Sequence, residues 1–271
     1  GKRVVLYGMN FAPEIAGVGK YTGEIAEYLT GQKAEVTVVT TPAHYPGWQV
    51  RDGYKNAYSS EVKNGMEIYR VPLFLKERMG GIWRLLAPMS FAATSAPVVL
   101  WQILRKRPDI VICVEPTLFA APLAILAAKA VGARTVLHVQ DLEVDAAFAV
   151  GHIKSLEFLK KFAFMFEKLT LKGFDRIITI SERMSAKLAE KTGNPAQVAI
   201  VRNWVDLEHI YPLGRTSSYR QELGYADDDF IVLYSGNIGA KQGLDTLMEA
   251  ATRLHDTQKK IKFVIAGEGP A

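Results

Sequence analysis

Residues 3–40 read RVVLYGMNFAPEIAGVGKYTGEIAEYLTGQKAEVTVVT, and this stretch decides the fold. The run at 3–8 is apolar and ends in glycine, and the run at 35–40 is rich in β-branched residues, so both are typical of strands. Between them, residues 19–29 place apolar side chains on one face of a helix. The stretch therefore predicts a strand–helix–strand unit of the kind that joins parallel strands.

The same pattern continues along the chain to about residue 201. Further strands are predicted at 66–71, 109–114, 134–139, 175–180 and 198–201, after a long loop at 41–60. A helix with breaks at its prolines is predicted at 82–104. Further helices are predicted at 118–131, 153–171 and 182–191. Continuous apolar strands separated by helices indicate a doubly wound parallel α/β sheet covered on both faces. We expect it to form a Rossmann-like N-terminal domain over residues 1–205.

A second domain is predicted to begin near residue 229. Residues 206–228 hold prolines, glycines and an acidic cluster, which suits a hinge or linker. Residues 229–271 contain one strand at 230–235, a helix at 244–254 and a strand at 261–266. One such unit buries little core by itself. We therefore expect 229–271 to be the start of a second, truncated Rossmann-like domain, and the natural protein to continue past Ala271.

The composition excludes some classes of protein and leaves others open. With 271 residues, 49% hydrophobic and 23% charged, the chain suits one large or two moderate folded domains and not a disordered protein. A net charge of +5 suits anionic ligands, an acidic membrane or nucleic acid, and selects none of them. The single cysteine, Cys113, excludes a disulfide framework and favours a reducing cytoplasm. No signal-peptide pattern opens the sequence.

One apolar stretch raises the question of a membrane. Residues 90–104 carry almost no charge but are shorter than the roughly 20 residues that a span requires. They include Pro97, and they are flanked by Arg84 and by basic residues at 105–107. Two interpretations stay open: a buried helix, or a helix that lies on an anionic membrane.

Doubly wound sheets bind ligands at the carboxyl ends of their strands, so the loops there hold the candidate site residues. After the first strand, Gly17 and Gly19 precede a helix, where backbone N–H groups and a close backbone approach favour a phosphate. Lys20 would add a positive charge. The alternative is a plain glycine turn. A dinucleotide fingerprint is disfavoured, because the last glycine of the run, Gly23, comes one position late.

Three polar residues follow other strands of the predicted sheet. His138 ends the strand at 134–139, where it could donate a hydrogen bond or carry charge near neutral pH, or simply be a core histidine. Asp141 lies close behind it, and Glu115 follows the strand at 109–114. Because Pro116 comes next, Glu115 suits a structural turn equally well.

The predicted second domain repeats the glycine-loop arrangement after its first strand. The loop reads GNIGAKQGL at 236–244 and begins a helix. Gly236, Asn237, Lys241 and Gln242 are therefore candidates for a second phosphate site. Either loop alone is weak evidence for a phosphate site, whereas two such loops in two domains are suggestive.

Several short motifs together resemble one known family. They are Tyr7-Gly8, Pro13-Glu14, Gly17 to Glu24 (GVGKYTGE), Tyr45-Pro46, Pro116 to Phe119 (PTLF), His138 to Asp141 (HVQD), Asn203-Trp204 and Tyr234 to Gly239 (YSGNIG). The chain resembles the family-4 glycosyltransferases of GT-B fold, and most of all their colanic-acid or exopolysaccharide fucosyltransferase type. The resemblance runs along essentially the whole chain.

The resemblance implies a retaining transfer of a sugar, with fucose as one candidate, from a GDP- or UDP-sugar without metal or cofactor. The acceptor would be a saccharide linked to a lipid pyrophosphate, and nucleic acid would have no part. Such an enzyme would work in the cytoplasm at the inner face of the plasma membrane. This agrees with the interpretation of 84–107 as membrane-facing.

The resemblance also implies roles for individual residues. The loop from Gly17 to Lys20 would lie near the donor diphosphate and the acceptor, and His138 and Asp141 would lie near the reacting sugar. Ser181 and Asn203 would line the cleft, and Lys241 would face the diphosphate. The sequence departs from the family at two positions, where Asn237 and Gln242 replace an arginine and a lysine. The family's acidic donor-binding motif would lie beyond Ala271.

Other functions remain as alternatives. A sugar-nucleotide epimerase of the same architecture would need no acceptor, and a non-catalytic fragment would only bind an acceptor or a partner. An oxidoreductase is disfavoured, because the second strand ends in Thr40-Thr41 and not in an acid for a ribose. No pair of carboxylates has the spacing of a glycosidase.

Overall fold

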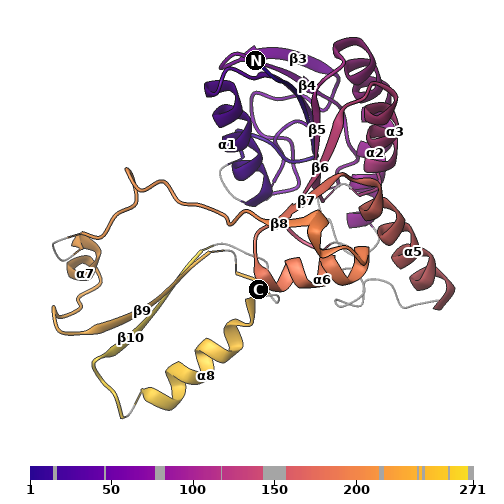
Figure 1. Ribbon diagram of the computed structural model, residues 1–271. Coiled ribbons are helices and arrows are strands. Elements are labelled where there is room, and N and C mark those ends of the chain that lie inside the picture. The colour runs from indigo at the N-terminus through magenta and orange to yellow at the C-terminus, as the bar shows by residue number, and fades with distance from the viewer. Residues whose placement is uncertain are drawn as a thin grey trace. The chain divides into compact units, whose positions relative to one another are not determined.

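The structure is a computed structural model that describes residues 1–14, 17–45, 47–76, 83–116, 118–142, 157–213, 217–236, 238–239, 242–255 and 257–267. The chain divides into two compact units, Gly1–Trp204 and Val205–Ala271, which are drawn in Figure 1. Each unit has its own sheet.

The first unit is built on an eight-stranded sheet. Its strands are β1 (Arg3–Tyr7), β2 (Glu35–Thr40), β3 (Ser59–Lys63), β4 (Met66–Arg70), β5 (Ile110–Glu115), β6 (Arg134–Val139), β7 (Arg176–Thr179) and β8 (Val198–Ile200). They lie in the order β3-β4-β2-β1-β5-β6-β7-β8. Every neighbouring pair is parallel except β3 with β4. The predicted parallel α/β sheet is confirmed.

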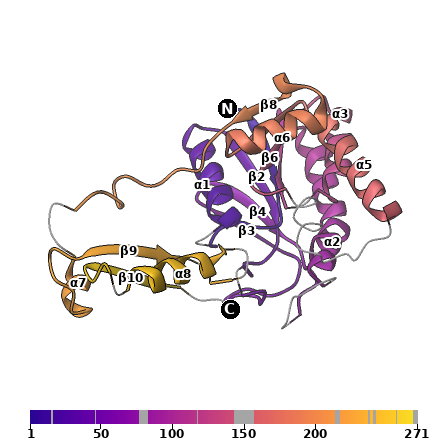
Figure 2. The same ribbon diagram turned by 90° about the horizontal axis from the view of Figure 1, so that it is seen from below.

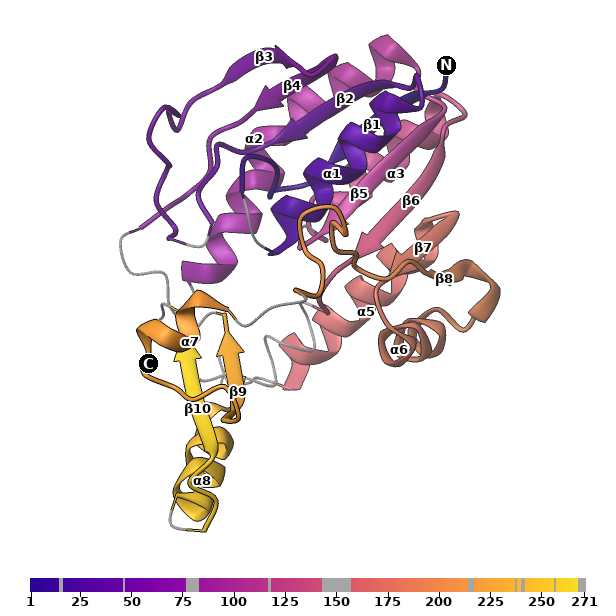
Figure 3. The same ribbon diagram turned by 90° about the vertical axis from the view of Figure 1, so that its left-hand side faces the viewer.

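Helices cover both faces of this sheet. Figures 1 and 3 show α1 (Gly17–Gly31) on one face, and α2 (Trp83–Lys106), α3 (Ala121–Ala130) and α5 (Glu157–Gly173) on the other. The helix α6 (Glu182–Thr192) and a short 3₁₀ turn, Pro195–Gln197, join β7 to β8. Alternate residues of β1 enter two separate cores: Val5 and Tyr7 pack with the α2 and α3 side, and Leu6 packs with the α1 side. This alternation follows from the period of two in a strand.

The prediction that prolines break the helix at 82–104 was wrong. α2 runs without interruption from Trp83 to Lys106 and contains both Pro88 and Pro97. A proline inside a helix removes one hydrogen bond and costs about 3 kcal/mol. Burial of Phe91, Val99 and Ile103 in the core of the first unit offsets that loss.

A hairpin at the edge of the sheet was missed in the sequence. β3 pairs with β4 in the antiparallel sense through a turn at Asn64 and Gly65. Both turn residues have positive φ, 51° and 76°. This is the geometry that an Asn-Gly pair favours in two-residue hairpin turns. The signal was present in the sequence, but the strand SSEVK is too polar to stand out by hydrophobicity.

Within the described residues, one helix is long and apolar enough to cross a membrane by length and composition, Leu86–Lys106 of α2. A core helix of a folded domain passes the same test. The inner face of α2 supports that interpretation, because Ala87, Phe91, Val99 and Ile103 are fully buried. Side chains such as Met89 and Trp101, on the outer side of α2, are exposed.

The second unit contains one strand–helix–strand motif. β9 (Phe230–Ser235) and β10 (Ile261–Ala266) are parallel, and α8 (Leu244–Leu254) connects them and lies along them, as Figure 2 shows. A short helix, α7 (Ser218–Glu222), lies inside the stretch predicted as linker. No described side chain of this unit is fully buried, which agrees with the expectation that a single βαβ unit encloses little core.

Candidate functional site

The first part of the candidate site is the point where the strand order of the sheet reverses. β1 pairs with β2 on one side and with β5 on the other, and ligands of doubly wound sheets bind at such a point. Gly8 follows β1, and a Cβ there would lie 2.9 Å from Cβ of Val114 in β5. Glycine at this position therefore lets the loop after β1 cross close to β5. Glu115, which follows Val114 and ends β5, is buried.

Gly17 and Gly19, which were predicted to precede the helix, form the first turn of α1, and this turn packs tightly against the preceding loop. Gly17 begins the helix with φ of 62°, which favours glycine. A Cβ on Gly19 would lie 2.2 Å from Oε2 of Glu14, and one on Gly23 would lie 2.9 Å from Cβ of Ala12. Close packing thus accounts for Gly19 and Gly23. The phosphate site at the N-terminus of α1 remains a prediction, and the packing fixes where that N-terminus lies.

Glu14 holds the loops after β1 and β2 together beneath the first turn of α1. Its side chain is buried, Oε2 accepts a hydrogen bond from Asn10 Nδ2 at 3.0 Å, and Oε1 accepts bonds from the backbone N–H groups of His44 and Tyr45 at 3.2 and 3.1 Å. These donors lie in the loops that follow β1 and β2. A carboxylate that satisfies buried N–H groups strongly favours one loop geometry.

Lys20 has partners within α1. Its ammonium lies 2.9 Å from a carboxylate oxygen of Glu24 and 4.5 Å from the ring centroid of Tyr21. The side chain is partly exposed. The structure therefore places Lys20 in a surface ion pair on the first turns of the helix, and a contact with phosphate stays a prediction.

His138 lies at the end of β6 in a buried position, with only 1% of its surface exposed. Burial lowers the pKa of its ring to about 4, so the ring is neutral at pH 7. The structure therefore favours a hydrogen-bonding role over the alternative of a charge near neutral pH. Gln140 Nε2 lies 3.1 Å from His138 Nε2, and an amide nitrogen only donates, so that ring nitrogen accepts.

A reciprocal pair of amides fixes Gln140. Its Nε2 donates to Oδ1 of Asn203 at 3.1 Å, and Nδ2 of Asn203 donates to Oε1 of Gln140 at 3.1 Å. Both hydrogens of the Gln140 amide are thus used, one toward Asn203 and one toward His138. The structure brings together His138 and Asn203, two predicted site residues 65 positions apart, through a residue that the prediction did not assign to the site.

The segment after β8 continues from this pair to α1. Nε1 of Trp204 donates to Oε2 of Glu24 at 2.5 Å, and the Trp204 ring meets that of Tyr21 edge to face at 5.1 Å. Asn203 and Trp204 therefore connect β6 with the N-terminal turns of α1. We refer to Gln140, Asn203, Trp204 and Glu24 as the edge clip.

The other predicted residues of the first unit have local structural roles. Ser181 caps α6, because its Oγ accepts a hydrogen bond from the Met184 backbone N–H at 3.3 Å. Asp141 is exposed, and its Oδ1 accepts a bond from the Leu142 backbone N–H at 2.9 Å. Neither role tests the proposed contact with a sugar.

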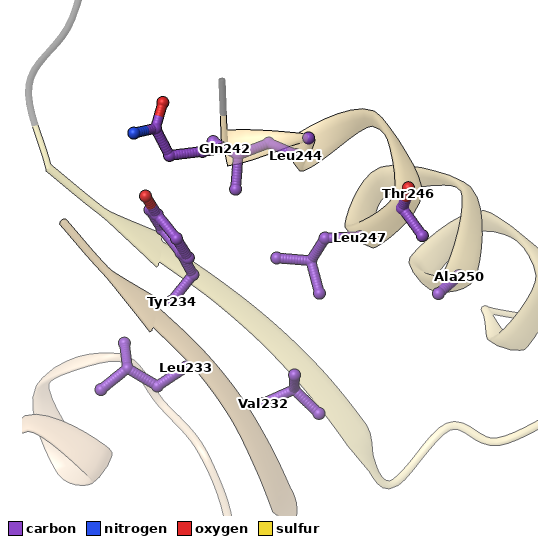
Figure 4. Close-up of a pocket in the computed structure, with 9 residues that line it drawn as sticks. Val232, Leu233, Tyr234, Gln242, Leu244, Thr246, Leu247 and Ala250 are labelled. Carbon is purple, nitrogen blue, oxygen red and sulfur yellow. The ribbon is translucent and has the colours of Figure 1, made fainter. Parts of the chain in front are cut away.

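Of the predicted residues in the second unit, Asn237 and Lys241 lie outside the described residues. Gly236 follows β9, and Gln242 precedes α8. Gln242 and Tyr234 line one end of a hollow of about 390 Å³ between β9 and α8, and side chains such as Val232 and Leu247 line the rest (Figure 4). This lining is mainly apolar, which is typical of a sheet–helix packing space and not of a diphosphate site.

The sequence contains little signal for the members of the edge clip. Gln140 follows His138 at a spacing of two, but the strand ends at Val139, so alternation alone does not place its side chain. Trp204 and Glu24 are 180 residues apart, and only the return of the chain across the sheet brings them into contact. The motif at 203–204 was noted for its resemblance, not for a predicted contact.

The lowered pKa of His138 predicts a dependence of stability on pH. The folded ring titrates near pH 4 and the unfolded ring near 6.5, so the unfolded chain binds more protons between these values. The contribution is fully present above pH 6.5 and is lost as the pH falls toward 4, by roughly 3 kcal/mol in total. Between pH 6.5 and 4, urea unfolding should show a smaller loss in the free energy of unfolding for His138→Gln than for the parent chain. His209→Gln at an exposed position is the control, and equal pH slopes for His138→Gln and the parent chain would contradict the assignment.

The chain has the GT-B fold of solved glycosyltransferases. HepE of Anabaena, solved in complex with UDP and glucose, superimposes with a TM-score of 0.58 at 13% identity, over 100% of this chain and 62% of its own. The chain belongs to the glycosyl transferase 4-like domain family, whose model matches residues 16–204. The model of the glycosyl transferases group 1 matches residues 216–271.

Two relatives match nearly the whole chain in sequence. The colanic acid biosynthesis glycosyl transferase WcaI of Escherichia coli K12 is 39% identical over 98% of this chain, which spans 66% of WcaI. The phosphatidylinositol N-acetylglucosaminyltransferase GPI3 subunit of Saccharomyces cerevisiae is 23% identical over 96% of this chain, which spans 51% of that protein. The family and the GT-B fold expected from the sequence are therefore confirmed.

Proposed function

We propose that the protein transfers a sugar from a nucleotide-sugar donor to a lipid-linked saccharide during synthesis of a cell-surface polysaccharide. The observation that carries the proposal is the neutral His138 at the carboxyl edge of the sheet, joined through the edge clip to the N-terminal turns of α1. The name of WcaI supports the polysaccharide pathway. The HepE complex supports a nucleoside diphosphate as part of the donor.

The proposed reaction exchanges one bond at the anomeric carbon of the sugar. The bond from this carbon to the diphosphate oxygen breaks, a bond to the acceptor hydroxyl oxygen forms, and the acceptor proton is released. Negative charge builds up on the leaving diphosphate, and N–H groups at a helix N-terminus stabilise such charge. Backbone N–H groups at the N-terminus of α1 would supply part of this stabilisation. We propose retention of configuration and no metal or cofactor in this step.

The acceptor is proposed to be a saccharide on a lipid pyrophosphate at the inner, cytoplasmic face of the plasma membrane. The lipid acceptor in the name of GPI3 supports this class of substrate. A GDP- or UDP-sugar would be the donor, with GDP-fucose as one candidate. Asp141, Ser181, Glu115 and Asn203 are proposed to line the cleft, and Asn237, Lys241 and Gln242 to bind the diphosphate.

The test is an assay of the complete product of the natural gene with a panel of GDP- and UDP-sugars. We expect release of nucleoside diphosphate that requires a lipid-linked saccharide, together with an acceptor whose mass increases by one sugar. Conversion of the donor without any acceptor would indicate an epimerase and contradict the proposal. Binding of the acceptor with no turnover of any donor would indicate a non-catalytic binding protein.

A further inference from the structure

The outer surface of α2, α3 and α5 carries large apolar side chains that no described element covers. Six of them are between 43% and 65% exposed: Trp101, Leu123, Leu126, Phe162, Met165 and Leu169. Single exposed apolar residues are ordinary, but a group on neighbouring helices is not. We call these six residues the outer helix face.

The three helices form one continuous layer. α3 contacts α2 on one side and α5 on the other, and the rings of Phe119 and Phe166 stack at 5.6 Å between the start of α3 and α5. Figures 1 and 3 show all three helices on the same side of the sheet. Residues that point away from the sheet on these helices therefore share one face of the unit.

α5 combines apolar and basic residues on its exposed side. The opposite side, with Thr170 and Leu171, is buried against the unit. The exposed residues recur at helical spacing and are Lys160, Lys161, Phe162, Met165, Lys168, Leu169 and Lys172. A helix with lysines interleaved among large apolar residues is typical of segments that lie in a membrane interface.

Exposed charge on this layer is of one sign. α2 and α3 contain no acidic residue, and α5 has only Glu157 and Glu167. Among the described side chains of the three helices, Glu167 is thus the sole acid, and it is buried and paired with Lys191. The exposed cations include Arg105 and Lys129 in addition to the lysines of α5.

This pattern selects one class of partner. Two copies of the outer helix face would bring lysines against lysines, which disfavours a symmetric dimer. A bilayer with anionic lipids accepts both kinds of side chain, because apolar groups enter the acyl boundary while lysines extend to the phosphates. Because the inner face of α2 is buried, the layer lies on the bilayer and does not cross it.

We propose that the outer helix face, with Lys161, Lys168 and Lys172, docks the first unit on an anionic lipid bilayer. The inference deepens the proposed function and rests on it for one point only, that the acceptor lies in a membrane. The sequence predicted a membrane contact at residues 84–107 alone. The proposed contact is instead a layer of three helices in which α5 supplies most of the positive charge.

The test is co-sedimentation of the purified chain with phosphatidylcholine vesicles that contain or lack phosphatidylglycerol. We expect binding to the phosphatidylglycerol vesicles, weaker binding as salt is raised, and little binding to phosphatidylcholine alone. The variant Lys161→Gln/Lys168→Gln/Lys172→Gln should bind about 100-fold more weakly. Met165→Gln/Leu169→Gln should also lose binding, and both variants should stay folded because these side chains are exposed.

The matched control is Lys33→Gln/Lys55→Gln/Lys63→Gln, which removes the same charge from exposed positions outside α2, α3 and α5. Equal losses in the two lysine variants would show attraction by net charge and overturn the proposal, as would the absence of any vesicle binding. A dimer that Met165→Gln/Leu169→Gln dissociates would assign the face to a second copy. Vesicle binding by a protein that transfers no sugar would leave the docking face standing and refute the proposed function alone.

Discussion

Replacing His138 with alanine in the complete natural protein is expected to slow sugar transfer on the order of 100-fold. The ring is neutral, buried and bonded to Gln140, so its loss removes a hydrogen-bonding group at the carboxyl edge and frees the Gln140 amide. Transfer is measured as nucleoside diphosphate released with acceptor present. Circular dichroism and a melting curve establish that the variant is folded. His209→Ala, at an exposed histidine in the second unit, should keep full activity.

Two routes to this loss can be separated by a double-mutant cycle. If His138 acts by positioning Gln140, then His138→Ala and Gln140→Ala together should cost little more than either alone. If His138 contacts the sugar itself, the two effects should multiply. Asn203→Ala should resemble Gln140→Ala, because the two amides bind each other reciprocally. Unchanged turnover in His138→Ala would remove the residue from the mechanism.

Replacing Glu14 with alanine is expected to give the largest loss of stability, roughly 3 kcal/mol in the free energy of unfolding. The change leaves two buried donors, Asn10 Nδ2 and the His44 backbone N–H group, and the partly buried Tyr45 N–H group without their carboxylate. It also opens a space beneath Gly19. For a unit of this size the loss corresponds to a fall in melting temperature of roughly 6–12 °C.

The variant Glu14→Gln should lose less stability than Glu14→Ala. Glu14→Gln keeps one oxygen for the two backbone N–H groups but turns an amide nitrogen toward Asn10 Nδ2, so we expect a loss of about 1 kcal/mol. Glu190→Ala, at an exposed position in α6, should leave the melting temperature nearly unchanged. If Glu14→Ala has the same melting temperature as the parent chain, the carboxylate does not hold the loops together. Differential scanning calorimetry measures all three variants.

Much of the fold could be predicted from local patterns. Strands β1, β2, β5, β6 and β7 are apolar runs of strand length, and such runs are buried on both faces of a parallel sheet. The polar strand β3 was missed because hydrophobicity does not mark an exposed edge strand. The uninterrupted α2 was missed because the penalty of a proline is local, whereas the burial that offsets it comes from residues on other elements.

The candidate site was predictable in its location but not in its contacts. Placing His138 at a strand's carboxyl end required only the boundary of β6. Its neutral state and its bond to Gln140 depend on atoms that surround it in space. Gly17 and Gly19 were predicted as a phosphate loop, and the structure adds that Gly19 is required by the buried Glu14.

By itself, the sequence determined the α/β class, the sheet of the first unit and the strand ends where polar residues collect. These features follow from the spacing of apolar residues along the chain, which local geometry converts into helices and strands. Only the tertiary structure decided that Trp204 reaches Glu24, that Asn203 holds Gln140, and that three helices share one basic and apolar outer face. Contacts between residues far apart in sequence depend on how the chain returns across the sheet, and local patterns do not encode that path.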